Sequence, residues 1–190
     1  MNALTSLLDR HYLLLRRLHS LSGIFPIGLF LIPHLTTNSS IVWGRLAGKG
    51  GVAAGVETFQ HEVNFIHSLP ALLLIEIFGL WLPLAFHAVL GVYFARTGRF
   101  NTKRYAYQGN WRYAWQRITG YIAFVFVFMH VGSLRWGWSF GGLMPPFDPE
   151  HAASSTAIHF QDGLWGNFAA VFYLVGVLAI VVRIACLPGA

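Results

Sequence analysis

The sequence predicts an all-α integral membrane protein with four transmembrane helices in one bundle. Of its 190 residues, 55% are hydrophobic and 11% are charged, against roughly 25% charged residues in a soluble domain. The apolar residues gather in four long runs, and three of these runs hold a histidine well inside them. An ionisable side chain in hydrocarbon needs a hydrogen-bond partner or a metal, so the bundle is predicted to be functional as well as structural.

The whole chain, 1–190, is predicted to be a single transmembrane domain. Its spans are expected at about 20–37, 68–95, 117–135 and 164–183. The first span is just long enough to cross a bilayer, and neighbouring helices can satisfy the backbone groups that its prolines leave open. The second is longer than a bilayer requires, so it is expected to tilt or to kink at Pro83.

The segments outside the spans are predicted to be polar. Residues 1–17 lack the apolar core and cleavage site of a signal peptide and are expected to be retained. Residues 36–67 are predicted to form a glycine-bearing loop with a short amphipathic piece at 56–65. Residues 141–163 are predicted to form a second, proline-containing loop.

Basic residues orient the spans. The N-terminal segment, the connection between spans two and three, and Arg183 hold ten of the thirteen Lys and Arg residues. By the positive-inside rule, the chain is expected in a bacterial cytoplasmic (inner) membrane with both termini cytoplasmic. The formal charge of +6 is spread between apolar runs and does not form one soluble face, so nucleic acid is excluded as a partner and membrane lipid is expected.

The depths of three histidines predict haem binding. His34 lies 14 residues beyond Ser20, and His130 lies 13 residues beyond Arg117, so both are about 20 Å from the cytoplasmic edge. Two histidines from different helices at one depth can ligate a haem iron from both sides. His87 lies nine residues before Arg96, about 14 Å from the same edge, and defines a second level.

The cysteine count limits the kind of redox group. Cys186 is the only cysteine in the chain, so the sequence has neither a thiolate iron-sulfur cluster nor a motif for covalent haem. Glycines share a helix face with two of the histidines, Gly91 with His87 and Gly23 with His34. Such positions make room for a macrocycle or for ordinary helix contacts.

Two further groups have open interpretations. His19, Arg16 and Arg17 can bind haem propionates through charge-assisted hydrogen bonds, or they can form an interfacial basic cluster that orients the first helix. Glu76 is eleven residues before His87 and near the outer boundary. It can relay protons to a quinone there, or it can be an interfacial or structural carboxylate.

Four blocks, at 16–35, 82–93, 110–120 and 172–178, resemble the dihaem cytochrome b subunit of succinate:quinone oxidoreductases. The resemblance extends from Tyr12 to about Val182. It implies a membrane anchor that docks a flavoprotein and an iron-sulfur subunit on its cytoplasmic face. It also implies electron transfer through haem b to or from quinone, with His34 and His130 as ligands of the distal haem and His87 as one ligand of the proximal haem.

The chain departs from this pattern near its end. The family places a fourth ligand late in span four, followed by a fifth span, and the alignment of 172–178 puts Arg183 at that ligand position. His159 precedes span four and lies at the wrong depth, so it is rejected as the missing ligand. The resemblance therefore leaves two alternatives open. Either the chain holds one fully ligated haem with a five-coordinate or absent second one, or the sequence is truncated or altered at its end.

Two other classes of protein remain open. One is a haem-free structural anchor that binds quinone only between helices. The other is a small membrane transporter or channel, which would not require a depth-matched histidine pair. The chain has no dinucleotide-binding glycine motif, so succinate itself is expected to be oxidised in the partner flavoprotein.

Overall fold

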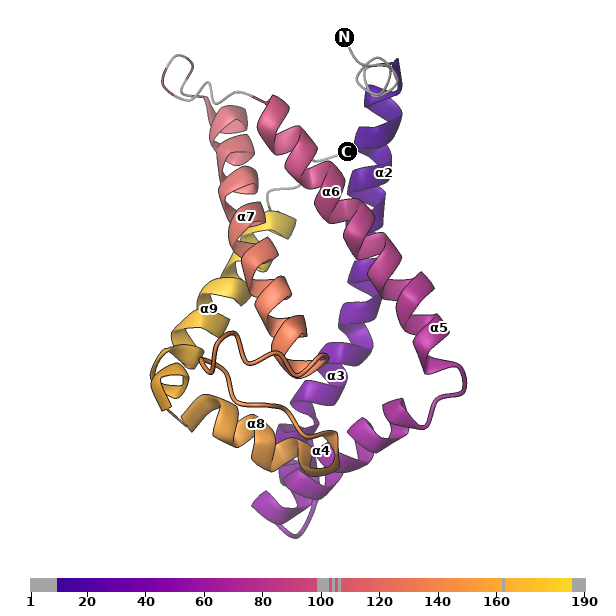
Figure 1. Cartoon of the computed structure of the whole chain (residues 1–190), viewed down its shortest axis with the longest axis vertical. Helices are drawn as coiled ribbons and strands as arrows, with labels where there is room; N and C mark the ends of the chain where they lie inside the picture. The colour runs from indigo at the N-terminus through magenta and orange to yellow at the C-terminus, as the bar shows by residue number, and fades with distance from the viewer. Residues whose placement is uncertain (1–9, 99–102, 104, 106, 162, 186–190) are drawn as a thin grey trace. The chain divides into compact units, whose positions relative to one another are not determined.

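The computed structural model describes residues 10–98, 103, 105, 107–161 and 163–185. Over these residues every regular element is a helix, as Figure 1 shows. Backbone contacts divide the chain into two compact units, Met1–Thr97 and Gly98–Ala190. The single domain stays a prediction.

Four helical stretches of the described chain are long and apolar enough to cross a membrane: Tyr12–Ala47, Leu72–Thr97, Gln108–Leu134 and Gly166–Arg183. Large apolar side chains on these stretches are exposed, for example Leu29, Phe78 and Val89. Such surfaces suit hydrocarbon, in which apolar side chains lose nothing by facing outward. The predicted all-α class with four spans is confirmed.

The first span consists of two helices, α2 (Tyr12–Ile24) and α3 (Pro26–Ala47), that meet at Phe25. Pro26 is the first residue of α3 and has no amide hydrogen to continue the α2 ladder. Hydrogen bonds from Phe25 N to Leu21 O and from Leu29 N to Phe25 O carry the chain past this point. The two helices therefore continue as one stretch of 36 residues, about 54 Å long.

The loop predicted at 36–67 is wrong, because α3 continues to Ala47 and α4 spans Val52–His67. The hydroxyl of Thr36 donates to the carbonyl of Ile32, and those of Ser39 and Ser40 donate to carbonyls three residues earlier. These side chains satisfy their own polarity inside the helix, so their presence does not end it. The predicted amphipathic piece at 56–65 lies within α4.

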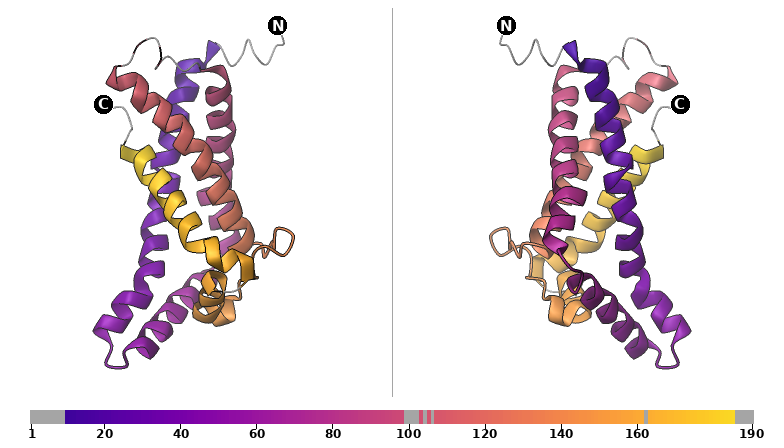
Figure 2. Two further views of the ribbon diagram at one scale, coloured as in Figure 1. Left: turned by 90° about the vertical axis from the view of Figure 1, so that its left-hand side faces the viewer. Right: turned by 90° about the vertical axis from the view of Figure 1, so that its right-hand side faces the viewer.

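α3 and α4 form a helical hairpin, visible in both views of Figure 2. The two helices approach closely at Gly55, where an added Cβ atom would meet the backbone carbonyl of Ile41. The buried residues recur every three or four positions: Thr37, Ser40 and Gly44 on α3, with Gly55, Phe59 and Val63 on α4. This spacing places them on one face of each helix.

The second span begins with α5 (Leu72–Glu76), continues through the π-helical turn η1 (Ile77–Trp81) and ends with α6 (Leu82–Thr97). The amide of Leu82 donates to the carbonyl of Ile77, five residues earlier. The irregularity ends two residues before Pro83, which lacks an amide donor. A π-turn thus lies where the sequence predicted a tilt or a kink. α6 packs against α2 within the first unit.

The second unit is built on α7 (Gln108–Leu134) and α9 (Gly163–Ala185), which pack against each other. α7 begins nine residues before the predicted span and reaches into the basic segment. A small apolar core forms around Met144 and Ala169, with four partly buried residues packed on it: Met129, Phe140, Phe172 and Tyr173.

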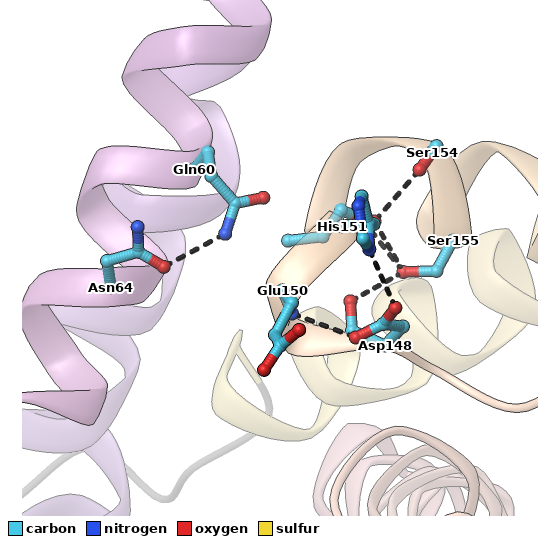
Figure 3. A network of polar contacts seen from close by, with 8 residues as sticks. Gln60, Asn64, Asp148, Glu150, His151, Ser154 and Ser155 are labelled. Atoms are coloured by element: carbon cyan, nitrogen blue, oxygen red, sulfur yellow. Dashed lines mark hydrogen bonds and ion pairs between the residues drawn. The ribbon is translucent and has the colours of Figure 1, made fainter.

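The loop predicted at 141–163 also contains helices, the 3₁₀ turn η2 (Pro149–His151) and α8 (Ala152–Gln161). Asp148 starts them, since its Oδ1 accepts a hydrogen bond from the amide of Glu150 and its Oδ2 accepts one from Nδ1 of His151, each at 2.9 Å (Figure 3). The hydrogen bond from His151 is the main cause of the lowered pKa of Asp148. Such capping is a polar signal that the prediction of a plain loop overlooked.

Candidate functional site

His87 is held in one orientation and one tautomer by α2. Its Nδ1 lies 2.9 Å from the main-chain oxygen of His19 and 3.2 Å from Oγ of Ser22. A carbonyl oxygen only accepts, and the Ser22 hydroxyl donates its hydrogen to that same carbonyl at 2.8 Å. Nδ1 of His87 must therefore carry a proton, so in the neutral imidazole Nε2 carries the lone pair that a metal requires.

The rings of His19 and His87 stack, with centroids 4.0 Å apart and planes inclined by 21°. Each ring lies against a glycine of the opposite helix. A Cβ atom at Gly23 would lie 2.6 Å from Cε1 of His87, and one at Gly91 would lie 3.2 Å from Cε1 of His19. Both glycines follow a histidine by four residues, so two His-x-x-x-Gly segments pack reciprocally.

This arrangement changes what the two glycines do. Gly23 was expected to leave space beside His34, and Gly91 to leave space beside His87 for a macrocycle. In the structure their open faces receive the rings of His87 and His19. The glycines thus allow α2 and α6 to approach closely enough for the imidazoles to stack.

His130 has a different neighbour in the second unit. Its Nδ1 lies 3.2 Å from the hydroxyl oxygen of Tyr173 on α9. The ring of His130 stacks with that of Phe126 at 5.5 Å and meets the Tyr173 ring edge-on at 5.6 Å. The imidazole is half-buried and is oriented from two sides.

His34 lies on α3 in the first unit, half-buried and stacked with Phe30 at 5.3 Å. The side-chain amide of Asn38 donates to the His34 carbonyl at 2.7 Å. His34 belongs to the first unit and His130 to the second, so their pairing stays a prediction.

Arg183 has its own contacts at the position where the resemblance expects a ligand. Its guanidinium donates to the main-chain oxygen of Gln116 at 3.0 Å and lies against Gly120 on α7. Guanidinium has no lone pair to give to iron. At this position, the residue present does not fit a second ligand of the proximal haem.

Haem b remains compatible with the other donors. The macrocycle supplies four ligands to its iron, so the protein needs to provide only one or two imidazoles. Among the described residues no three His, Cys, Asp or Glu side chains gather to hold a bare metal ion. The hydrogen bond at Nδ1 of His87 makes Nε2 the nitrogen that would bind iron, as in histidine ligands of haem. His87 therefore fits the role of one haem ligand.

The candidates at the span ends are placed as follows. Arg16 and Arg17 are exposed on α2, and Arg16 also donates to the Tyr12 hydroxyl at 3.3 Å. His19 is half-buried beside His87, so it lies nearer to the predicted haem level than an interfacial residue would. Glu76 is half-buried at the end of α5, directly before the π-turn.

His159 is 2% exposed and lies on α8. Burial lowers its pKa, although the carbonyl of Pro145 acts in the opposite direction. It packs edge-on against Phe160 and Tyr173. The imidazole is therefore buried inside the second unit, in contact with aromatic rings.

Shallow, open grooves flank α2 and α3 in the described part of the first unit. One, of about 330 Å³, has Ser22 as its polar lining residue and is otherwise apolar: Leu18, Leu21, Phe25, Pro26, Leu82, Pro83 and Phe86. The other, of about 210 Å³, combines Glu62 and two threonines with apolar walls: Ile32, Pro33, Thr36, Thr37, Phe65 and Ile66. Glu76 lines neither of them.

Two residues of the site were missed by the sequence analysis. Ser22 follows His19 by three residues and so shares its helix face, a spacing that could have drawn attention to it. Tyr173 lies inside the block at 172–178, but nothing in the sequence links it to His130. Its role emerges only from the packing of α7 on α9.

Comparison with known proteins decides the family. The chain is 38% identical over 163 residues to the succinate dehydrogenase cytochrome b558 subunit of Bacillus subtilis (strain 168), covering 79% of this chain and 75% of that protein. The chain belongs to the succinate dehydrogenase cytochrome b subunit family. No family model matches the chain, and no solved structure matches it.

Membership of the succinate dehydrogenase cytochrome b subunits agrees with the helical architecture. The four apolar stretches and the relative together make this chain a multi-pass membrane protein. The resemblance found in the four sequence blocks is confirmed at the level of the family.

Proposed function

We propose that this chain is the membrane anchor of a succinate dehydrogenase or fumarate reductase complex and holds b-type haem for electron transfer to or from quinone. The observation that carries the proposal is the hydrogen bond from Nδ1 of His87 to the His19 carbonyl. It leaves Nε2 as the ligand nitrogen of a histidine inside an apolar span.

Three histidines would hold the cofactor. His34 and His130 would bind one haem from both sides. His87 would bind a second haem if the chain holds one. Haem b supplies an iron that carries one electron at a time. The apolar spans would keep water from these imidazoles in a membrane. Arg16 and Arg17 would offer positive charge to propionate groups, and His19 would offer a hydrogen bond.

Soluble partners would complete the reaction. The matched relative is named as a succinate dehydrogenase subunit, which supports a complex with a flavoprotein and an iron-sulfur subunit. The basic segment that connects α6 and α7 would face these partners on the cytoplasmic side together with both termini. Quinone would bind near the distal haem, and Glu76 would exchange the protons that accompany the electrons of the quinone.

Haem content of the purified chain tests this function. A pyridine haemochrome assay with a reduced-minus-oxidised spectrum is expected to find haem in the unmodified protein. His34→Ala and His130→Ala should each remove the same haem, and His87→Ala should remove any second one. His61→Ala is the matched control, since His61 lies on α4 with a side chain that is 77% exposed. Absence of haem from the unmodified protein would contradict the proposal.

A haem-free structural anchor is the second candidate. Two observations favour it: the Arg183 side chain bonds to α7 where the family pattern expects a ligand, and His87 already stacks on His19. This alternative predicts that the chain assembles with the soluble subunits but shows no visible absorption. Retained assembly of a His34→Ala, His87→Ala double variant, combined with a colourless unmodified protein, would support it.

A further inference from the structure

Tyr173 is the polar residue that the second unit places against a predicted haem ligand. Its hydroxyl oxygen lies 3.2 Å from Nδ1 of His130, and the two rings meet at 79°. The contact joins α9 to α7, so it depends on the packing of two spans and not on local sequence.

The position of Tyr173 is set by an aromatic cluster. Its ring meets Phe126 edge-on at 5.4 Å and Phe172 edge-on at 5.8 Å, and it lies 4.9 Å from Phe160. These contacts hold the ring from three elements, namely α7, α8 and α9 itself. These contacts fix the direction in which the Tyr173 ring points. The hydroxyl is therefore held beside His130, as a positioning group requires.

The chemistry of imidazole gives this contact a consequence. When Nε2 binds a metal, Nδ1 carries the ring proton and needs an acceptor. A hydrogen bond accepted from Nδ1 orients the ring and raises the basicity of the ligand nitrogen. A more basic ligand favours ferric over ferrous iron. In an apolar span, where water does not compete, such a bond is stronger than in water.

We propose that the Tyr173 hydroxyl accepts the hydrogen bond from Nδ1 of His130 and thereby sets the orientation and the donor strength of this imidazole toward haem iron. Tyr173 is a positioning residue in this role, because it acts through His130 and does not touch the iron. The proposal rests on the proposed function and adds a residue that the sequence analysis did not single out.

Tyr173→Phe tests the role, since it keeps the ring and removes only the hydroxyl. The haem of the purified chain is expected to remain bound, with its preference for the ferric state weakened about tenfold. That change is about 59 mV upward in reduction potential for one electron. A redox titration followed in the visible spectrum measures it, and the low-spin ferric EPR signal should shift with it.

Tyr121→Phe is the matched control. Tyr121 lies on the same helix as His130, nine residues earlier, with 46% of its surface exposed. Its replacement removes a hydroxyl without touching the histidine and should leave potential and EPR signal unchanged. A Tyr173→Phe protein with both unchanged would overturn the role of Tyr173 while leaving haem binding intact. Absence of haem from the unmodified chain would overturn the proposed function and this role together.

Discussion

His19 and His87 stack at 4.0 Å, and each ring fills the space beside the glycine that follows the other histidine by four residues. This reciprocal packing joins α2 to α6 at the level of a predicted haem ligand. It also supplies the carbonyl of His19 as the acceptor that fixes the His87 tautomer. Packing and ligand chemistry therefore depend on the same contact.

Gly23→Ala should disrupt this contact. The new methyl group would lie 2.6 Å from Cε1 of His87, so the ring must move away from its acceptors. Overpacking of this kind costs about 1–3 kcal/mol, against a gain of about 0.5–1 kcal/mol from replacing glycine in a helix. Thermal unfolding in detergent should show a net loss of about 1–2 kcal/mol.

Gly28→Ala provides the comparison for this loss. The nearest atom to its added methyl group is a backbone oxygen at 3.7 Å, an ordinary contact. This variant should be neutral or slightly more stable than the unmodified protein. Equal unfolding temperatures for the two variants would show that the His87 ring can move without loss of stability. That result would contradict a stabilising role for the reciprocal packing.

Hydropathy sufficed to predict the four spans because hydrocarbon forces every backbone group into a helix. It did not suffice outside them. Ser39 and Ser40 lie in a segment that reads as a polar loop, yet their hydroxyls bond to carbonyls of their own helix and α3 continues to Ala47. Polar residues end an apolar run, but the helix itself can continue through them.

The candidate site shows a similar division. Counting residues along a helix estimates the depth of His87 but says nothing of what lies across from it. Ser22 and Tyr173 entered the site only through contacts between helices, the first from α2 to α6 and the second from α9 to α7. Sequence periodicity carries no information on such pairs unless their spacing repeats, as it does for the two His-x-x-x-Gly segments.

Arg183→His should raise the haem content if the unmodified chain holds one haem. The resemblance places a ligand histidine at 183, and the structure shows that the side chain there reaches α7 at Gln116 and Gly120. An imidazole at this position can ligate iron, whereas guanidinium cannot. The pyridine haemochrome assay is expected to rise from one haem per chain to two.

Arg183→Gln separates ligation from the loss of the arginine. Glutamine removes the positive charge and offers no imidazole, so the haem content should stay at one. A rise in both variants would mean that the arginine merely obstructs the site. No rise in Arg183→His would mean that residue 183 does not complete a haem site in this chain.

His159 should make the stability of the second unit depend on pH. Burial lowers its pKa below the usual 6.5, so the unfolded chain binds a proton more readily than the folded one. The stabilising contribution is fully present above about pH 6.5 and is lost as the pH falls from there toward the folded pKa. A single proton contributes a slope of at most about 1.4 kcal/mol per pH unit.

Thermal unfolding in detergent between pH 8 and pH 5 measures this dependence, with about 1.4 kcal/mol per pH unit as the ceiling for one group. His159→Gln should flatten the curve between pH 6.5 and pH 5, because glutamine does not titrate. An identical slope in His159→Gln would show that the folded protein admits the charged imidazole, and that the interior around Phe160 and Tyr173 is open to water.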